Sequence, residues 1–279
     1  MIVPITYEAS SGRKYDLVTN GILHRKANYH KWEWGVEGTK LQYGYRVSDF
    51  SREPAVYETE LIFAGTYMRR RALINALHDD FENDVRTKKT GKLIWGDYYI
   101  NCYVVESSTE PDENDTWTTN KIAFYAPYPF WVQDFFVSLP PSQVSTGLFL
   151  DYPYDYAYDY TSPVMGSRYI STDFPFASDF RMVIYGSAVN PRVTINGYPY
   201  VLYTTIPQGS YVIIDSRAKT VMMYGANGQQ TNIFDFRNKN QSVFEKITGG
   251  DLQIIWNATF GVDLTIYHER SEPRVEVIT

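Results

Sequence analysis

Carboxylates are the side chains best able to do chemistry in this sequence, and their spacing decides which chemistry. Glu58 and Glu60 alternate along residues 55–63, and two acids held at a set separation across a cleft could hydrolyse a glycoside. Alternating acids on one strand usually form its solvated side, so we expect no catalytic pair. The acids of residues 112–116 (DENDT) lack the spacing of an EF-hand calcium loop, which favours a solvated hairpin tip.

The other reactive side chains are few and scattered. The histidines, His24, His30, His78 and His268, have no zinc-ligand spacing. The single cysteine, Cys102, lies in an apolar strand pattern typical of a buried, inert thiol. Motifs for a nucleophilic serine, a phosphate loop and a dinucleotide site are absent from the sequence. We therefore expect no enzyme activity, no metal and no cofactor.

A group of misplaced charges predicts contacts rather than catalysis. Arg69, Arg70 and Arg71 occupy the first turn of a predicted helix, where the helix dipole disfavours positive charge, and Asp79 and Asp80 lie in its second half. Either strands of the same subunit supply their partners, or a neighbouring copy does so, head to tail around a ring. We treat these five residues as candidate interface residues.

Tyrosine occupies every second position of one strip: Tyr152, Tyr154, Tyr156, Tyr158 and Tyr160. The aspartates between them, four residues apart, would lie about 13 Å apart on an extended chain, which is too far for one metal ion. A sugar platform needs fewer rings. Packing within its own domain and contact with another chain remain, because tyrosine combines a large apolar body with a polar tip. We add the five tyrosines to the candidate interface.

The elements that position these residues follow from hydrophobic periodicity. Residues 66–89 predict an amphipathic helix of about five turns, with Thr66 as its cap and Gly91 just past its end. Its apolar stripe is Leu73, Leu77, Phe81 and Val85. A hairpin turning at Gly96-Asp97 follows. The rest of the first half has strand periodicity, and we expect Trp32, Trp34, Tyr43 and Tyr45 to be buried in the sheet rather than to line a subunit contact.

The chain divides into two predicted domains. Residues 1–131 form a first domain of strands plus the helix and hairpin, and residues 132–150 form a Pro/Ser/Gly-rich linker. Residues 151–269 contain seven or more short strands separated by turns and predict a β-sandwich. The fold class is therefore mainly β with one long α-helix.

Composition excludes several classes of protein. The 279 residues carry a formal net charge of −6 and 16% aromatic side chains, which indicates a folded chain without an overall affinity for phosphate and with no sequence-specific nucleic-acid binding. The sequence contains no run of 18 apolar residues, so we expect no membrane insertion. One cysteine allows no internal disulfide and suits assembly in a reducing cytoplasm.

Several segments together resemble a known family. GTYMRRRALINALHDDF, GKLIWGDYYINCYVV and APYPFWV in the first half, and GSAVNPRVTING, GSYVIID and ITGGDLQIIW in the second, occur in an order and spacing that resemble the distal tail proteins of long-tailed bacteriophages (siphoviruses). DYPYDY and DFPF resemble that family's domain junction. The similarity covers nearly the whole chain, although no single motif is specific.

The resemblance implies a baseplate hub in the virion. The first domain, completed by residues 270–279, would form a homo-hexameric ring, alone or as two rings back to back, and a galectin-like sandwich would hang outside it. The ring would join the tail tube protein to the tail-associated fibre or lysin protein, with receptor-binding proteins as further candidates. Its channel would pass the tape-measure protein and DNA. The alternative is a carbohydrate-binding β-sandwich adhesion module, for which Trp256 and the tyrosines of residues 198–203 are candidates.

Overall fold

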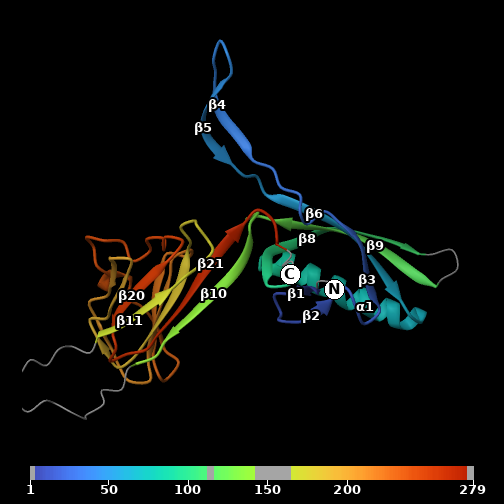
Figure 1. Ribbon diagram of the computed structural model, residues 1–279. Coiled ribbons are helices and arrows are strands. Elements are labelled where there is room, and N and C mark those ends of the chain that lie inside the picture. Colours follow the sequence, from blue (N-terminus) through green and yellow to red (C-terminus); the bar gives the residue numbers. More distant parts are fainter. Residues whose placement is uncertain (1–3, 112–115, 142–164, 275–279) are drawn as a thin grey trace, which may run out of the picture. The chain divides into compact units, whose positions relative to one another are not determined.

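The computed structural model describes residues 4–111, 116–141 and 165–274. The chain separates into two compact units, Met1–Gln133 with Glu269–Thr279, and Asp134–His268. Strands dominate both units, and the described residues contain one α-helix, in the first unit (Figure 1). The mainly β fold class with one long helix is therefore confirmed.

The first unit has two antiparallel sheets that share one long strand, and a separate two-stranded hairpin. Its strands are β1 (Ile5–Glu8), β2 (Lys14–Asp16), β3 (Ile22–Ala27), β4 (Gly35–Lys40), β5 (Tyr45–Ser51), β6 (Ala55–Ala64), β7 (Gly91–Trp95), β8 (Tyr98–Pro111), β9 (Trp117–Ala126) and the start of β10 (Trp131–Leu139). The sheet orders are β2-β1-β7-β8-β10 and β3-β6-β9-β8. Residues 98–102 of β8 pair with β7, and residues 103–111 pair with β9. The predicted hairpin at Gly96-Asp97 is the β7–β8 turn.

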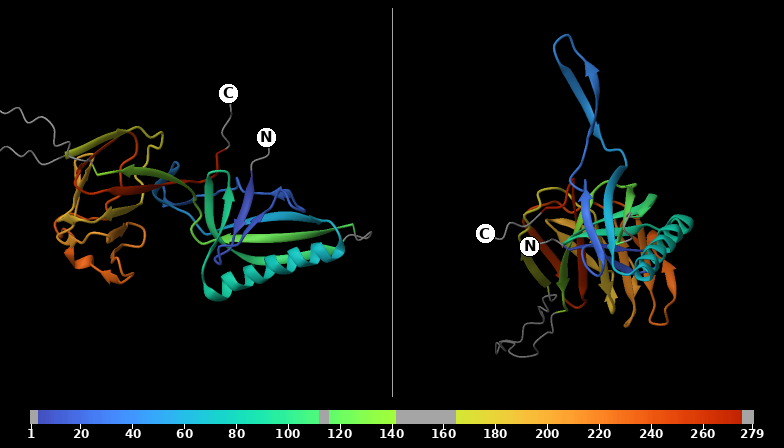
Figure 2. Two further views of the ribbon diagram at one scale, coloured as in Figure 1. Left: turned by 90° about the horizontal axis from the view of Figure 1, so that it is seen from below. Right: turned by 90° about the vertical axis from the view of Figure 1, so that its right-hand side faces the viewer.

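Helix α1 (Tyr67–Thr87) lies along the strands of the first unit (Figure 2). Its buried residues are Arg70, Ile74, Leu77, Asp80, Phe81 and Asp84, so the buried stripe is rotated from the predicted one and Val85 is 47% exposed. Lys88 ends the helix in the left-handed conformation at φ 55°. Gly91 instead begins β7, and a Cβ there would lie 2.3 Å from the Tyr7 hydroxyl oxygen.

The core of the first unit is aromatic. Tyr7 contacts Phe81 of the helix edge-on at 5.0 Å between ring centroids and Phe124 of β9 at 5.8 Å. Strand β6 alternates as predicted, with Tyr57, Leu61 and Phe63 buried and Glu58 exposed. The helix therefore closes one side of the core by packing its apolar side chains against those of the strands.

The second unit is a β-sandwich. Its strands are the rest of β10, β11 (Met165–Ile170), β12 (Phe180–Tyr185), β13 (Ala188–Val189), β14 (Arg192–Ile195), β15 (Tyr198–Val201), β16 (Thr205–Ile206), β17 (Tyr211–Asp215), β18 (Thr220–Tyr224), β19 (Gln230–Asn232), β20 (Leu252–Asn257) and β21 (Val262–Arg270). A short 3₁₀ helix spans Phe234–Phe236. One sheet runs β19-β18-β17-β12-β21-β10 and the other β11-β20-β14-β15, and β13 pairs with β16 in a separate two-stranded sheet. The two larger sheets contribute to one core, where Phe180 meets Tyr200 at 5.2 Å.

The segment predicted as a linker begins as a strand. Residues 132–139 belong to β10, which pairs with β8 at Val132 and Gln133. Alternating residues of this stretch, such as Val137 and Leu139, are buried, a pattern that its neighbouring prolines and glycine obscure in the sequence. Residues 142–150 of the predicted linker lie outside the described residues, and the predicted domain boundaries stay a prediction.

The chain returns to the first unit after the sandwich. Tyr128 donates a hydrogen bond to Glu269 (2.7 Å), and Arg52 donates one to the Ser271 hydroxyl (3.2 Å). Glu269 and Ser271 thus contact the first unit, and completion of the first domain by residues 270–279 stays a prediction. The predicted edge-strand positions Val275 and Val277 lie outside the described residues.

We expect Asp179 to set part of the acid sensitivity of the second unit. Burial raises its pKa, but hydrogen bonds from Lys246 (3.0 Å) and Ser216 (2.8 Å) outweigh burial and leave the pKa below its ordinary value. A lowered pKa stabilises the fold above the unfolded value and loses that contribution as pH falls through the folded value. Asp179→Asn should flatten the fall of Tm below about pH 4, measured by circular dichroism. The exposed control Asp173→Asn should not, and equal slopes would contradict the assignment.

Candidate functional site

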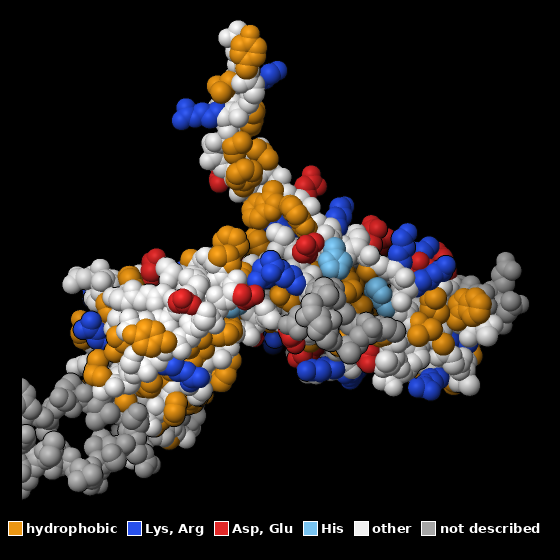
Figure 3. Space-filling view, viewed as in Figure 1, with side chains coloured by type: hydrophobic (Ala, Val, Ile, Leu, Met, Phe, Trp, Pro, Cys, Tyr) orange, Lys and Arg blue, Asp and Glu red, His pale blue; other side chains and the backbone are white. Residues whose placement is uncertain are grey.

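The first unit carries a hairpin arm, which we define as residues 35–51, strands β4 and β5 with their turn. Among the described strands, β4 and β5 pair only with each other. The arm projects from the rest of its unit (Figures 1 and 2), and hydrophobic side chains run along it (Figure 3). A two-stranded hairpin is marginally stable at best in water, so the arm needs a surface to cover it.

The arm is amphipathic. Residues that pair across two strands share a face, and the register therefore sorts the side chains into two sets. The apolar face carries Val36 (50% exposed), Tyr45 (51%), Val47 (43%) and Phe50 (57%), with Lys40 opposite Tyr45 at its end. The polar face carries Glu37, Thr39, Arg46 and Asp49. An uncovered apolar face opposite a charged one is typical of a surface that binds another chain.

The prediction that the tryptophans and tyrosines of this segment are buried was wrong. Trp32 is 50% exposed, Trp34 39%, Tyr43 87% and Tyr45 51%. Strand periodicity indicates that one face of a strand is apolar, but it does not indicate whether the same chain or another chain buries that face. The aromatic alternation was therefore correct as a strand signal and misleading as a signal of burial in the same subunit.

Arg52 fixes the root of the arm. Its guanidinium lies 4.6 Å from the ring centroid of Phe130 and 5.4 Å from that of Trp34, and these two rings contact each other at 6.0 Å. The same guanidinium donates to Ser271 of the returning segment. Cation–π contacts of this kind contribute about 0.5–2 kcal/mol, so the arm leaves a defined base.

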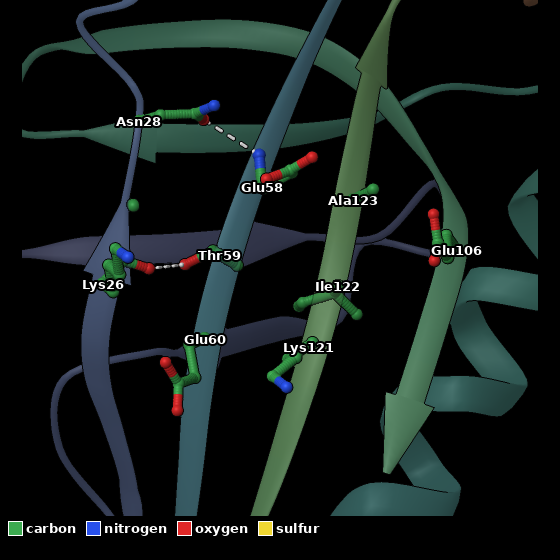
Figure 4. Close-up of a pocket in the computed structure, with 10 residues that line it drawn as sticks. Lys26, Asn28, Glu58, Thr59, Glu60, Glu106, Lys121, Ile122 and Ala123 are labelled. Carbon is green, nitrogen blue, oxygen red and sulfur yellow. Dashed lines mark hydrogen bonds between the residues drawn. The ribbon is translucent and has the colours of Figure 1, made fainter.

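The outer face of the sheet β3-β6-β9-β8 holds a pocket of about 360 Å³ (Figure 4). Glu58 and Glu106 lie opposite Ala123 on the strands at either side. Among the described residues, neither glutamate side chain has a hydrogen bond or an ion pair, whereas Lys121 pairs with Glu110 at 2.9 Å. No partner therefore orients either carboxylate for proton transfer. Glu58 is exposed and Glu60 pairs with Arg25 at 3.1 Å, so this is the solvated face that the sequence predicts for these acids.

Arg70 and Asp80, predicted as interface residues, have partners within the chain. Arg70 is 2% exposed and donates to the carbonyl oxygens of Gly65 (2.7 Å) and Thr116 (3.0 Å). Asp80 accepts a hydrogen bond from Tyr15 and pairs with Arg13 at 3.2 Å. These contacts correspond to the alternative of partners in the same subunit, and we do not propose either residue for an interface.

The other predicted interface residues remain available. Arg69, Arg71 and Asp79 are exposed. Residues 152–160, with their five tyrosines, lie outside the described residues, as does the predicted hairpin tip at residues 112–115. For these positions the interface stays a prediction.

A buried carboxylate that sequence reasoning missed holds the helix to β1. Asp84 is 0% exposed and accepts hydrogen bonds from the Tyr7 hydroxyl (2.6 Å) and from the backbone N–H (3.1 Å) and hydroxyl of Ser10. Burial and the bond to Asp84 raise the pKa of Tyr7, so the phenol stays protonated and donates. The partners are 74 and 77 residues away in sequence, and no local signal links them.

Metal-ligand clusters and the single thiol were the remaining candidates for chemistry. The described residues contain no group of three His, Cys, Asp or Glu side chains that could hold a metal ion. Burial raises the pKa of the Cys102 thiol, which disfavours the reactive thiolate. No helix in the described part of the chain is long and apolar enough to span a membrane.

Solved structures of phage tail proteins share this architecture. The SPP1 Dit protein, described as a paradigm of the hub of the adsorption apparatus in phages that infect Gram-positive bacteria, matches 97% of this chain with a TM-score of 0.62 and 9% identity. The chain has the fold of a phage tail hub. A chain of the phage P2 baseplate in its activated conformation with Ca matches 98% with a TM-score of 0.62 and 14% identity, and all of each solved chain is covered. No protein-family model and no curated protein matches in sequence.

Proposed function

We propose that this protein is a structural hub of a phage tail tip, in which six copies form a ring around a central channel. The observation that carries the proposal is the hub fold over nearly the whole chain, combined with an arm whose apolar face no described residue of the same chain covers. The ring would join the tail tube to the tail-associated fibre or lysin protein and to receptor-binding proteins, as a component of the virion assembled in the host cytoplasm.

The sheet β3-β6-β9-β8 supports ring closure. At one edge β3 pairs only with β6, and at the other edge residues 103–111 of β8 pair only with β9 among the described strands. Open edges are templates for pairing with another chain. Two different edges on one subunit make a head-to-tail contact, which closes into a ring when the rotation between copies allows it.

The solvated face around Glu58 and Glu60 supports the channel. DNA that must pass a channel should meet few phosphate-binding groups, because each neutralised phosphate adds affinity. This face has no excess of positive charge: Lys26 and Lys121 line the pocket beside three glutamates, and Arg25 pairs with Glu60. We assign this face to the channel, through which the tape-measure protein and DNA would pass. No residue is proposed for catalysis.

The native mass of the purified full chain tests the proposal. Six copies of a 32.3 kDa chain give a particle of about 194 kDa, and two rings back to back give twice that mass. Analytical ultracentrifugation over a range of concentrations should find one of these species. A chain that stays monomeric at high concentration would contradict ring formation.

The carbohydrate-binding alternative remains a prediction with its own test. Specific, saturable binding of the full chain to defined glycans on an array would support it. The absence of such binding, together with a ring in solution, would favour the hub alone.

A further inference from the structure

The start of α1 presents a corner that lacks charge partners. We define the corner as Tyr67, Met68, Arg69 and Arg71. Met68 is 76% exposed and Tyr67 52%. Arg71 lies over the Tyr67 ring at 5.6 Å, and Arg69 reaches only the Asn20 carbonyl oxygen at 3.5 Å. In the described part of the chain, neither arginine has an ion pair, although positive charge at a helix start costs about 0.3–1 kcal/mol.

A groove with the opposite properties lies between the later part of α1 and β8. It has a volume of about 430 Å³ and is lined by His78, Phe81, Glu82, Val85, Val104, Val105, Glu106 and Ser107. A β-bulge between Val104 and Glu106 leaves Val105 without a partner on β9 and 57% exposed. Val85 is 47% exposed. The apolar walls of the groove are therefore exposed to solvent in the isolated chain.

The charge in the groove is negative. Glu106 has no ion pair among the described residues, and Glu82 pairs with Arg86 one turn along the helix. Burial lowers the pKa of His78, so the imidazole, which contacts Ser107 at 3.0 Å, is neutral near pH 7. The corner and the groove thus combine apolar side chains with opposite charges.

Corner and groove adjoin opposite edges of the same sheet. The corner lies beside the start of β3, since Arg69 contacts Asn20, two residues before that strand. The groove includes residues 104–107 of β8, whose outer edge is open. Across the sheet, Ile22 at the start of β3 lies level with Pro111 of β8, about five residues from Glu106. Pairing of the β3 edge of one copy with the β8 edge of the next, staggered by about five residues, would bring a corner next to a groove.

We propose that the corner of one subunit inserts into the groove of the next copy, with Met68 against Val85 and Val105 and with the arginines facing Glu106 and Glu82. This contact rests on the proposed ring and specifies one of its interfaces. It uses the two exposed arginines predicted as interface residues and replaces the predicted acidic partners Asp79 and Asp80 with glutamates of the groove.

A charge swap tests the contact in the full chain. Arg71→Glu and Glu106→Arg should each weaken the assembly at least about 30-fold, because loss of one partner in a desolvated pair costs about 2 kcal/mol or more. The double variant R71E/E106R should restore most of the loss. Met68→Asp should dissociate the ring without lowering the Tm of the subunit. Lys89→Glu and Asp97→Arg make the same charge changes on exposed residues outside the corner and groove, and they should leave the assembly intact.

The outcomes separate this contact from the ring itself. A wild-type ring that survives all the corner and groove variants would overturn the contact and leave the proposed function standing. Single variants that dissociate the ring without rescue in the double variant would also overturn the pairing. A wild-type chain that never assembles would contradict both.

Discussion

Replacing the apolar face of the arm should dissociate the assembly into folded monomers. The change is Val36→Thr, Val47→Thr and Phe50→Thr in one chain, which keeps strand-forming residues while removing apolar surface. Burying each such side chain contributes about 1.5–3 kcal/mol. Even with the costs of association, we expect the affinity between copies to fall at least 100-fold, or about 3 kcal/mol. Sedimentation velocity at matched concentrations measures the change.

The polar face of the arm supplies a matched control. Glu37→Thr, Arg46→Thr and Asp49→Thr alter the same two strands and the same number of residues on the opposite face. This variant should assemble as the wild type does. If both variants dissociate, the apolar face has no special role in assembly. If neither variant dissociates, another surface holds the copies together. Either result would contradict the prediction.

Removing the Asp84 carboxylate should destabilise the first unit strongly. Asp84→Ala leaves the buried Tyr7 hydroxyl and the partly buried Ser10 N–H without their partner, and an unsatisfied buried group costs about 1–3 kcal/mol. We expect the free energy of unfolding to fall by about 3 kcal/mol. Five of the six tryptophans lie in the first unit, so tryptophan fluorescence during urea unfolding reports mainly on that unit.

Two further variants make this result specific. Asp79→Ala removes a neighbouring carboxylate that is exposed on the same helix, and it should change stability by no more than about 0.5 kcal/mol. Tyr7→Phe removes one donor and should cost about 1–2 kcal/mol. Equal effects of Asp84→Ala and Asp79→Ala would show that the buried network does not hold the helix in place.

The sequence predicts the local elements of the first unit well and their contacts poorly. The helix and the β7–β8 hairpin follow from periodicities of 3.6 and 2 that short windows contain. The rotation of the buried helix face does not follow from periodicity. Arg70, Asp80 and Asp84 are buried because they form hydrogen bonds with Thr116, Tyr15 and Tyr7. These partners come from distant parts of the chain, and isolated carboxylates and arginines are rarely buried without them.

The candidate surfaces illustrate a different limit. The arm has the alternation of a buried strand, and only the tertiary structure shows that its own chain leaves it uncovered. Its polar face, with Glu37 and Asp49 directly opposite each other, becomes visible only once the register is known. The groove depends on a bulge at Val105, which the apolar run YYINCYVV does not indicate. Likewise, exposure of Arg69 and Arg71 beside a buried Arg70 distinguishes three residues that the sequence treats alike.

Electron microscopy of the purified full chain tests the central claim most directly. Class averages of single particles should show six subunits related by rotation around an open centre, with a mass of about 194 kDa per ring. A particle of one or two subunits, or a closed assembly without a central opening, would contradict the account.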